Sequence, residues 1–134
     1  MKAIDCLRAE VVPQAQGKVL EIGMGSGLNL KHYDQTKVDM IWGLEPSEGM
    51  RRKAQSKVAE SSLEIEWLDL PSEQIPLPDN SADTVVLTYT LCTIVDWQSA
   101  LKEMRRVLKL DGQLLFSEHG ESCLLYTSPS PRDS

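Results

Sequence analysis

One stretch of sequence decides the fold of this chain: Val19-Leu20-Glu21-Ile22-Gly23-Met24-Gly25-Ser26-Gly27-Leu28-Asn29. An apolar, β-rich segment ends at three glycines with the spacing G-x-G-x-G, and a helix-like pattern follows. Glycine adopts positive φ at low cost and, having no Cβ, lets a ligand approach the backbone. A strand, a tight turn and a helix start in this order are typical of nucleotide-like cofactor sites in α/β proteins. The alternative is a plain structural turn.

The glycine spacing separates two kinds of cofactor. A dinucleotide fingerprint reads G-x-G-x-x-G, which would put the third glycine at position 28. The chain has Leu28 there, and its third glycine is Gly27. The turn is therefore a poor match to NAD or FAD, and an NAD-dependent oxidoreductase is the less favoured alternative.

The composition of the chain further narrows the classes of function that are expected. The 134 residues suffice for one domain with a core. A net charge of −6 argues against a general nucleic-acid footprint, so no nucleic-acid partner is expected. No apolar run approaches the roughly 20 residues of a membrane span, and no signal-peptide core follows the N-terminus. The three cysteines and two histidines are isolated, which predicts no metal site and favours a reducing, cytoplasmic location.

Apolar periodicity predicts alternating strands and helices. We expect strands over residues 18–22, 40–45, 63–68, 83–89 and 113–118. We expect helices from Gly25 or Ser26, over 48–60 with Ser47 as N-cap, and over 97–109 with Asp96 as cap. Pro13 should stop or kink a short helix, residues 71–81 should form a loop, and Asp111-Gly112 should turn the chain. This order predicts an α/β fold: a Rossmann-like, doubly wound, mostly parallel sheet with helices on both faces.

The glycine segment resembles motif I of class I S-adenosylmethionine (SAM)-dependent methyltransferases, roughly V-L-E/D-x-G-x-G-x-G. The resemblance, of the methyltransferase type 11 kind, runs from about Gly17 to Gly120. It implies SAM as the cofactor and a small-molecule methyl acceptor as the partner: a thiol, amine, quinol or lipid headgroup. SAM brings its own electrophile, so the protein mainly orients the acceptor, and no dedicated acid/base pair is required.

Motif I implies one set of cofactor-binding residues: Glu21, Gly23, Gly25, Ser26, Gly27 and Asn29. The helix expected near Ser26 would direct its N–H groups at the methionine carboxylate. Glu45 ends the second strand about 20 residues past the middle glycine, where a carboxylate can accept both ribose hydroxyls; the alternative is a solvated acid. Residues 46–50 resemble the family's D/E-P-S-x-x-M, which adds Pro46, Ser47 and Met50. Met50 would pack near adenine, or alternatively belong to the core.

The third contact region departs from the family in part. Residues 70–83 match the second half of the family's G-D-A-E-x-L-P-F-P-D-x-S-F-D. In the first half, Pro71 replaces the acid that usually meets the adenine amine. We therefore expect Ser72 and Glu73 to contribute, unless nearby Asp69 substitutes.

The end of the fourth strand should face the methyl group and the substrate. The resemblance assigns Thr88 and Tyr89 to the cofactor and Thr90 and Cys92 to the substrate wall. The form T-x-x-L-C-x-V/I, with Ser117-Glu118-His119, resembles a subgroup of bacterial small-molecule and membrane-associated thiol methyltransferases, with phospholipid and quinone relatives further off. We expect Cys92 to be a packing residue, and a role as nucleophile is the less favoured alternative. His119 either assists proton removal or ends the fifth strand, so no catalytic residue is firmly assigned.

The family's full domain is longer than this chain, which indicates a fragment. Residues 1–16 are read as an N-terminal helical remnant, 17–120 as a truncated SAM-binding methyltransferase domain of about five strands, and 121–134 as a disordered tail. The sixth and seventh strands would be missing, leaving the fifth as an exposed apolar edge. Residues 125–133 also look like translated sequencing adapter, which raises the hypothesis that the tail is not native. A SAM-binding fragment or degenerate module without catalysis is therefore the main alternative function.

Overall fold

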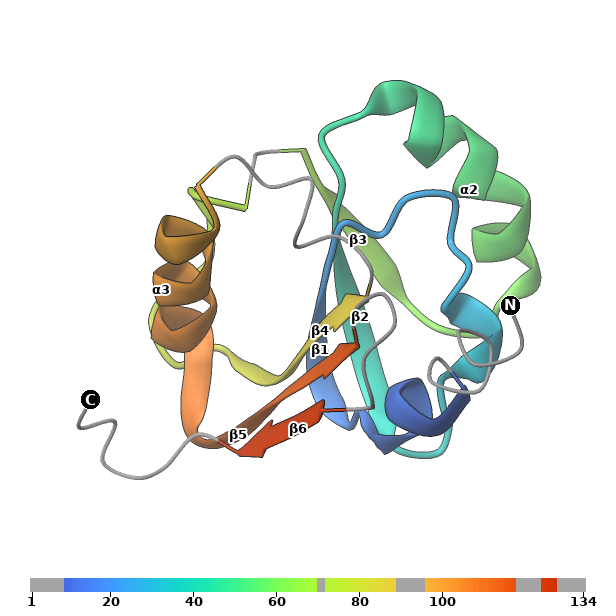
Figure 1. Ribbon diagram of the computed structural model, residues 1–134. Coiled ribbons are helices and arrows are strands. Elements are labelled where there is room, and N and C mark those ends of the chain that lie inside the picture. Colours follow the sequence, from blue (N-terminus) through green and yellow to red (C-terminus); the bar gives the residue numbers. More distant parts are fainter. Residues whose placement is uncertain (1–8, 70–71, 89–95, 118–123, 128–134) are drawn as a thin grey trace.

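A six-stranded sheet in the order β3-β2-β1-β4-β5-β6 forms the centre of the computed structural model, which describes residues 9–69, 72–88, 96–117 and 124–127 (Figure 1). The strands are β1 (Gly17–Ile22), β2 (Val38–Leu44), β3 (Ile65–Leu68), β4 (Ala82–Thr88), β5 (Leu108–Ser117) and β6 (Leu124–Thr127). The neighbours from β3 to β5 are all parallel. The strand order reverses direction between β1 and β4, and ligands bind at such switch points in open α/β sheets.

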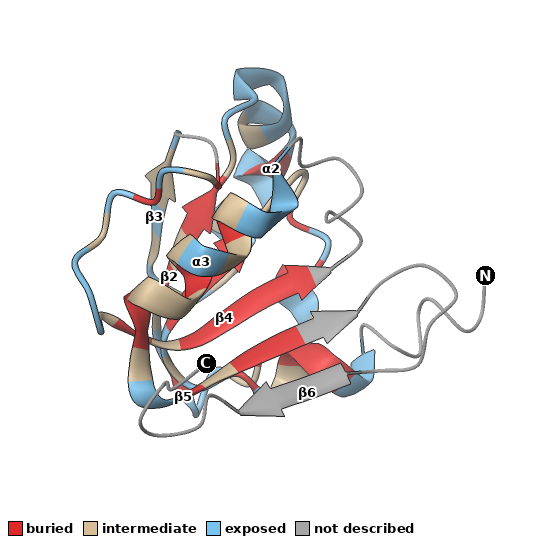
Figure 2. Cartoon of the chain, turned by 60° about the vertical axis from the view of Figure 1, so that its left-hand side comes forward, coloured by how far each residue is buried: buried red, intermediate tan, exposed pale blue. Residues whose placement is uncertain are grey.

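Helices cover both faces of the sheet, which confirms the predicted doubly wound architecture. Figure 1 shows α3 (Trp97–Val107) on one side and α2 (Glu48–Glu60) on the other. On the α3 side, Met104 belongs to one buried core with Leu20 and Leu87, and the opposite core contains Val19, Ile41 and Val86. Strand β4 is buried at each of its residues from Val85 to Leu87 (Figure 2). Its continuous apolar run predicted a strand covered on both faces.

Both α-helices begin at the residues that the sequence indicated. The Ser47 hydroxyl accepts a hydrogen bond from Met50 N at 3.3 Å, and α2 ends at Glu60 as predicted. Asp96 accepts one from Ser99 N at 3.1 Å. Helix α3 ends at Val107, two residues early, because Leu108 already has extended backbone and pairs with Ala82 of β4.

The helix predicted after the glycine turn is wrong. Residues 25–29 form turns, and only a short 3₁₀ helix, η2 (Leu30–His32), follows. Ten residues connect Gly27 to β2 and must run back along a strand of about 20 Å. Ten α-helical residues would span about 15 Å and leave nothing for the turn into β2. The connection is therefore too short for a regular helix.

Two further predictions near glycine and proline are corrected. The predicted stop at Pro13 is corrected in part. The α-helical residues end at Val11, but the 3₁₀ helix η1 (Val12–Gln14) follows directly and contains Pro13 in its first turn, where proline's missing N–H costs nothing. Asp111-Gly112 is not a turn, because β5 runs through it with a register irregularity against β4. A Cβ on Gly112 would lie 3.0 Å from the Asp83 carbonyl oxygen, so this glycine permits close approach of the two strands.

The expected disordered tail and exposed edge are wrong for residues 124–127. These residues form β6, which pairs antiparallel with β5 from Gln113↔Thr127 to Phe116↔Leu124. The sheet therefore has six strands where about five were expected. β5 is paired on both sides along this stretch, so its backbone groups do not form an open edge.

The loop between β3 and β4 is fastened to α3 by one arginine. Arg106 donates through all five of its N–H groups: to both Glu103 carboxylate oxygens, to Asp79 and to the carbonyls of Ile75 and Leu77, at 2.8–3.0 Å. Glu103 also accepts from Ile75 N at 3.0 Å. This network fixes the path of residues 75–79 along the helix.

Acid is expected to destabilise the protein partly through this network. The hydrogen bond from Arg106 holds the pKa of Glu103 below its usual value, so the unfolded chain binds this proton more readily. The contribution to the free energy of unfolding is complete above the ordinary glutamate pKa of about 4.3 and is lost as pH falls through the lower folded value. Chemical denaturation from about pH 6 to about pH 3 should give a shallower decline for Glu103→Gln than for the parent. Equal slopes would contradict this prediction.

Candidate cofactor site

The glycine turn is built as its spacing predicted. Gly23, Gly25 and Gly27 have φ values of +66°, +58° and +85°, which side-chain-bearing residues rarely adopt. The turn is bonded to the end of β2, since Gly23 N and Met24 N both donate to the Leu44 carbonyl, at 2.9 and 3.2 Å. The turn therefore sits at the carboxyl edge of β1 and β2.

The glycines of the turn differ in their surroundings. A Cβ on Gly27 would lie 3.2 Å from Leu30 Cδ1 and 3.4 Å from Ala54 Cβ, so Gly27 permits close packing of the turn against α2. A Cβ on Gly25 would meet only Met50 Cε at 3.7 Å and Gly23 O at 3.8 Å. Gly25 therefore lies on the open side of the turn, where a ligand can approach its backbone.

The carboxylate of Glu45 lies directly against the turn. Its Oε1 accepts a hydrogen bond from Gly25 N at 2.7 Å, and its Oε2 accepts one from Ser47 N at 3.1 Å. A carboxylate oxygen has two acceptor positions, so each oxygen keeps one for a ligand hydroxyl. The half-buried Glu45 is thus fixed at the strand end, which does not fit the alternative of a freely solvated acid.

Glu21 and Asn29 lie beneath the turn. Glu21 is 2% exposed; it accepts hydrogen bonds from Asn29 Nδ2 at 2.9 Å and from the Tyr33 hydroxyl at 2.8 Å. Burial first, and then the charge and hydrogen bond of Glu21, raise the pKa of Tyr33 well above its usual value. These side chains position the turn from below. Tyr33 was not among the predicted cofactor-site residues.

The remaining residues of the motif I and β2 regions lie around the turn. Ser26 is half-buried, while Pro46 and Ser47 are exposed at the start of α2. Met50 is 37% exposed beside Gly25, so it is not the core residue of the alternative interpretation. An exposed thioether beside an open turn is available to pack against a flat apolar ligand.

Gly43 is a supporting residue that the sequence analysis missed. A Cβ at this position of β2 would overlap the sulfur of Met24, whose side chain is buried beneath the turn. The signal was available, because a glycine inside a strand often marks close approach of another group.

The predicted contacts beyond β3 are described only in part. Ser72 is buried, and Glu73 accepts a hydrogen bond from Asp96 N at 3.2 Å, which ties it to the start of α3. Asp69 is exposed. Thr88 ends β4, but its side chain is not described. The other predicted positions lie outside the described residues: Pro71, Tyr89, Thr90, Cys92 and His119.

The arrangement is suited to holding a polar ligand with a pair of hydroxyl groups. It offers a glycine turn that is open on the side of Gly25, a fixed carboxylate and an adjacent thioether at the switch-point edge of the sheet. Over residues 9–69, 72–88, 96–117 and 124–127, no group of three or more histidine, cysteine, aspartate or glutamate side chains could hold a metal ion. In the same ranges no helix is long and apolar enough to cross a membrane.

Comparison with known proteins shows which family the chain belongs to. The model of a methyltransferase domain matches residues 20–116, which run from Leu20 in β1 to Phe116 in β5 and include the turn and Glu45. The chain belongs to this family. The membership confirms the predicted methyltransferase resemblance and Rossmann-like fold.

Three relatives of this methyltransferase domain show its range. A phosphatidylethanolamine N-methyltransferase of Cereibacter sphaeroides is 30% identical over 105 residues, covering 77% of this chain and 51% of that protein. A ubiquinone/menaquinone biosynthesis C-methyltransferase of Burkholderia mallei is 31% identical over 119 residues, covering 87% and 48%. The crystal structure of a SAM-dependent methyltransferase from Aquifex aeolicus has a TM-score of 0.65 and 28% identity, covering 74% and 54%. The chain thus spans about half the length of the curated relatives it matches.

Proposed function

We propose that this chain is the cofactor-binding part of a SAM-dependent methyltransferase that acts on a small molecule. One observation carries the proposal: the Glu45 carboxylate is fixed 2.7 Å from Gly25 N, at the open side of a positive-φ glycine turn. An acid at the end of the second strand is the group that accepts ribose hydroxyls in Rossmann-like sites. A turn with no side chain allows the rest of the ligand to approach the backbone.

Different residues of the site would bind different parts of the cofactor. The two free acceptor positions of Glu45 would take the ribose hydroxyls, and Met50 would pack against the adenine. The amides of the turn would hold the methionine end. A helix dipole is not expected to contribute to binding the methionine carboxylate, because η2 has three residues and starts at Leu30, beyond the turn. Bound SAM supplies a sulfonium methyl group, and the chain contributes orientation and exclusion of water.

For the methyl acceptor we propose a set of four chemical classes and no single compound. A thiol, an amine, a quinol or a lipid headgroup is supported by the subgroup resemblance and by relatives named for phosphatidylethanolamine and for ubiquinone and menaquinone. Thr90 and Cys92 would line the site that holds the acceptor. We infer a cytoplasmic location from the sparse, unpaired cysteines, and a domain over residues 17–120 that includes the matched range.

Calorimetric titration of the chain with SAM and with NADH tests the proposal. We expect saturable binding of SAM and none of NADH, and methyl transfer to at least one member of a panel of thiols, amines, quinols and lipid headgroups. Binding of SAM with no transfer to any of them would favour the binding module without catalysis. Binding of NADH alone would overturn both.

Glu45→Ala should weaken SAM binding by about 1.5–3 kcal/mol, which is about 10- to 150-fold in Kd, because hydrogen bonds to a charged group are lost. Glu45→Gln separates two roles, since its amide oxygen still accepts from Gly25 N but no charge remains for the hydroxyls. We expect it to bind with intermediate affinity. The control is Glu48→Ala, which removes an exposed acid whose partner is Arg52 at 3.4 Å. Equal SAM affinity in Glu45→Ala and Glu48→Ala would remove Glu45 from the site.

A further inference from the structure

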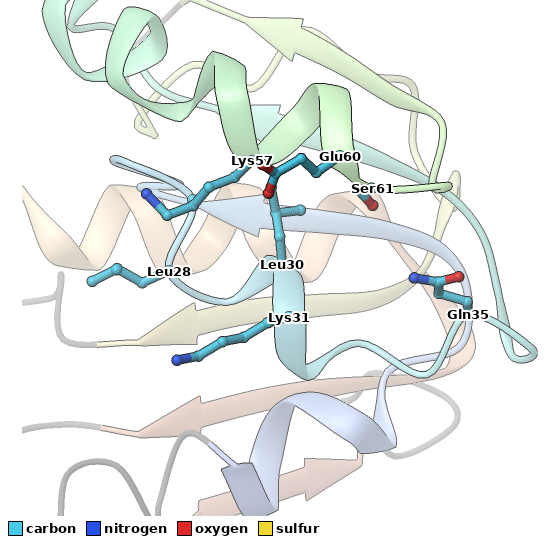
Figure 3. Close-up of a pocket in the computed structure, with 8 residues that line it drawn as sticks. Leu28, Leu30, Lys31, Gln35, Lys57, Glu60 and Ser61 are labelled. Atoms are coloured by element: carbon cyan, nitrogen blue, oxygen red, sulfur yellow. The ribbon is translucent and has the colours of Figure 1, made fainter.

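A second cavity, of about 360 Å³, lies between η2 and the C-terminal half of α2 (Figure 3). This volume is in the range of sites that hold small molecules. The cavity shares Gly27 with the glycine turn but includes neither Gly25 nor Glu45. The segment η2, which contributes to the lining, has three residues where a longer helix was expected.

Two lysines give the cavity an unbalanced positive charge. Lys31 comes from η2 and Lys57 from α2, and Figure 3 shows both side chains extending toward the side to which β1 and β4 point. Within the described part of the chain, neither amino group has an ion-pair partner at 4.0 Å or closer. Glu60 is the one acid of the lining, so the lining carries two positive charges against one negative charge. An anion at the mouth of the cavity would be attracted by both amino groups.

Apolar surface lies next to these charges. Leu28 is 51% exposed, and Figure 3 shows its side chain between those of Lys31 and Lys57. Leu30 is buried and closes the inner side of the cavity. A single exposed leucine is ordinary on a protein surface. A leucine between two unpaired lysines at the mouth of a cavity matches a ligand with an anionic group and a short apolar part.

We propose that this cavity binds a small amphipathic anion, a carboxylate or a phosphate monoester on a short apolar chain. The anionic group pairs with Lys31 and Lys57. The apolar chain lies against Leu28 and Leu30. The site adjoins the proposed SAM site at Gly27 but uses none of the other residues placed there.

Binding of four compounds to the chain, followed by amide NMR shifts and calorimetry, tests this site. Octyl phosphate and octanoate combine charge with an apolar chain, inorganic phosphate has only the charge, and 1-octanol has only the chain. We expect saturable one-to-one binding of octyl phosphate or octanoate, with shifts at residues 27–31 and 57–61, and binding at least 10-fold weaker for phosphate and octanol. The stronger of the two amphipathic anions identifies the headgroup.

Matched variants decide whether the cavity is responsible. Lys31→Gln and Lys57→Gln should each weaken binding at least 5-fold, while Lys53→Gln, an exposed lysine of α2 outside the lining, should leave it unchanged. Leu28→Ser should weaken octyl phosphate binding and spare phosphate. No saturable binding, or equal losses in the three lysine variants, would overturn the proposal. SAM titration of the same variants should match the parent, so failure here is distinguishable from failure of the SAM site.

Discussion

Gly25→Val is expected to abolish detectable SAM binding while the sheet remains folded. Gly25 has φ of +58°, where a β-branched residue is strained by about 1–2 kcal/mol. The added Cβ itself has room, since its nearest atoms are Met50 Cε at 3.7 Å and Gly23 O at 3.8 Å. The branched side chain would therefore occupy the space above the turn that the cofactor needs. The loss should appear in calorimetry, with circular dichroism reporting the retained fold.

Two other glycines provide controls for this variant. Gly49→Ala places a Cβ in the first turn of α2, where its one close neighbour is Ser47 Oγ at 3.9 Å, so binding should be unchanged. Gly27→Ala meets Leu30 and Ala54 at 3.2 and 3.4 Å and also has positive φ, so it should lower thermal stability. If Gly25→Val bound SAM as tightly as Gly49→Ala, the turn would not be the cofactor site.

Among the variants proposed here, Arg106→Met is expected to lower the free energy of unfolding most, by about 2–4 kcal/mol. The variant removes five hydrogen bonds that reach Glu103, Asp79 and the carbonyls of Ile75 and Leu77. Each such bond is worth about 0.5–1.5 kcal/mol, discounted here because the Arg106 side chain is 32% exposed. Arg106→Lys should be intermediate, because a lysine ammonium has three donors and no planar fork.

The matched control for this prediction is a second arginine that forms an exposed ion pair. Arg52 and Glu48 are 3.4 Å apart with side chains 71% and 77% exposed, so Arg52→Met should cost less than about 0.5 kcal/mol. Urea denaturation of both variants measures the difference. The Arg106 variant should also bind SAM more weakly, because the loop it fastens leads back to Ser72 and Glu73. Equal midpoints for the two variants would show that the network adds nothing.

Much of the fold was predictable because local signals agreed with the tertiary structure. The apolar runs of β1 and β4 end where strands end, and Ser47 and Asp96 cap the helices they precede. The positive φ of the three turn glycines and the meeting of Glu45 with Gly25 also follow from spacing along adjacent parallel strands. These features depend on residues close in sequence or on a standard crossover.

The features that sequence reasoning missed depend on distances and partners that spacing does not encode. The helix after the turn was replaced by η2 because ten residues must cover the length of β1. The sequence analysis assigned β6 to a disordered tail although residues 124–127 are mostly apolar, and the pairing of β6 depends on a free side of β5. The hydrogen bond from Tyr33 to the buried Glu21, and the five hydrogen bonds of Arg106, join groups that meet only after folding. The cavity beside α2 is lined in part by η2, the short segment found where this helix was expected.

The most direct test of the central claim is a crystal structure of the chain with S-adenosylhomocysteine, the unreactive form of the cofactor left after methyl transfer. The account predicts density above Gly23–Gly27, with both ribose hydroxyls within hydrogen-bonding distance of the Glu45 carboxylate and the adenine against Met50. A saturated crystal in which the ligand lies elsewhere, or in which Glu45 keeps only its bonds to Gly25 and Ser47, would contradict it.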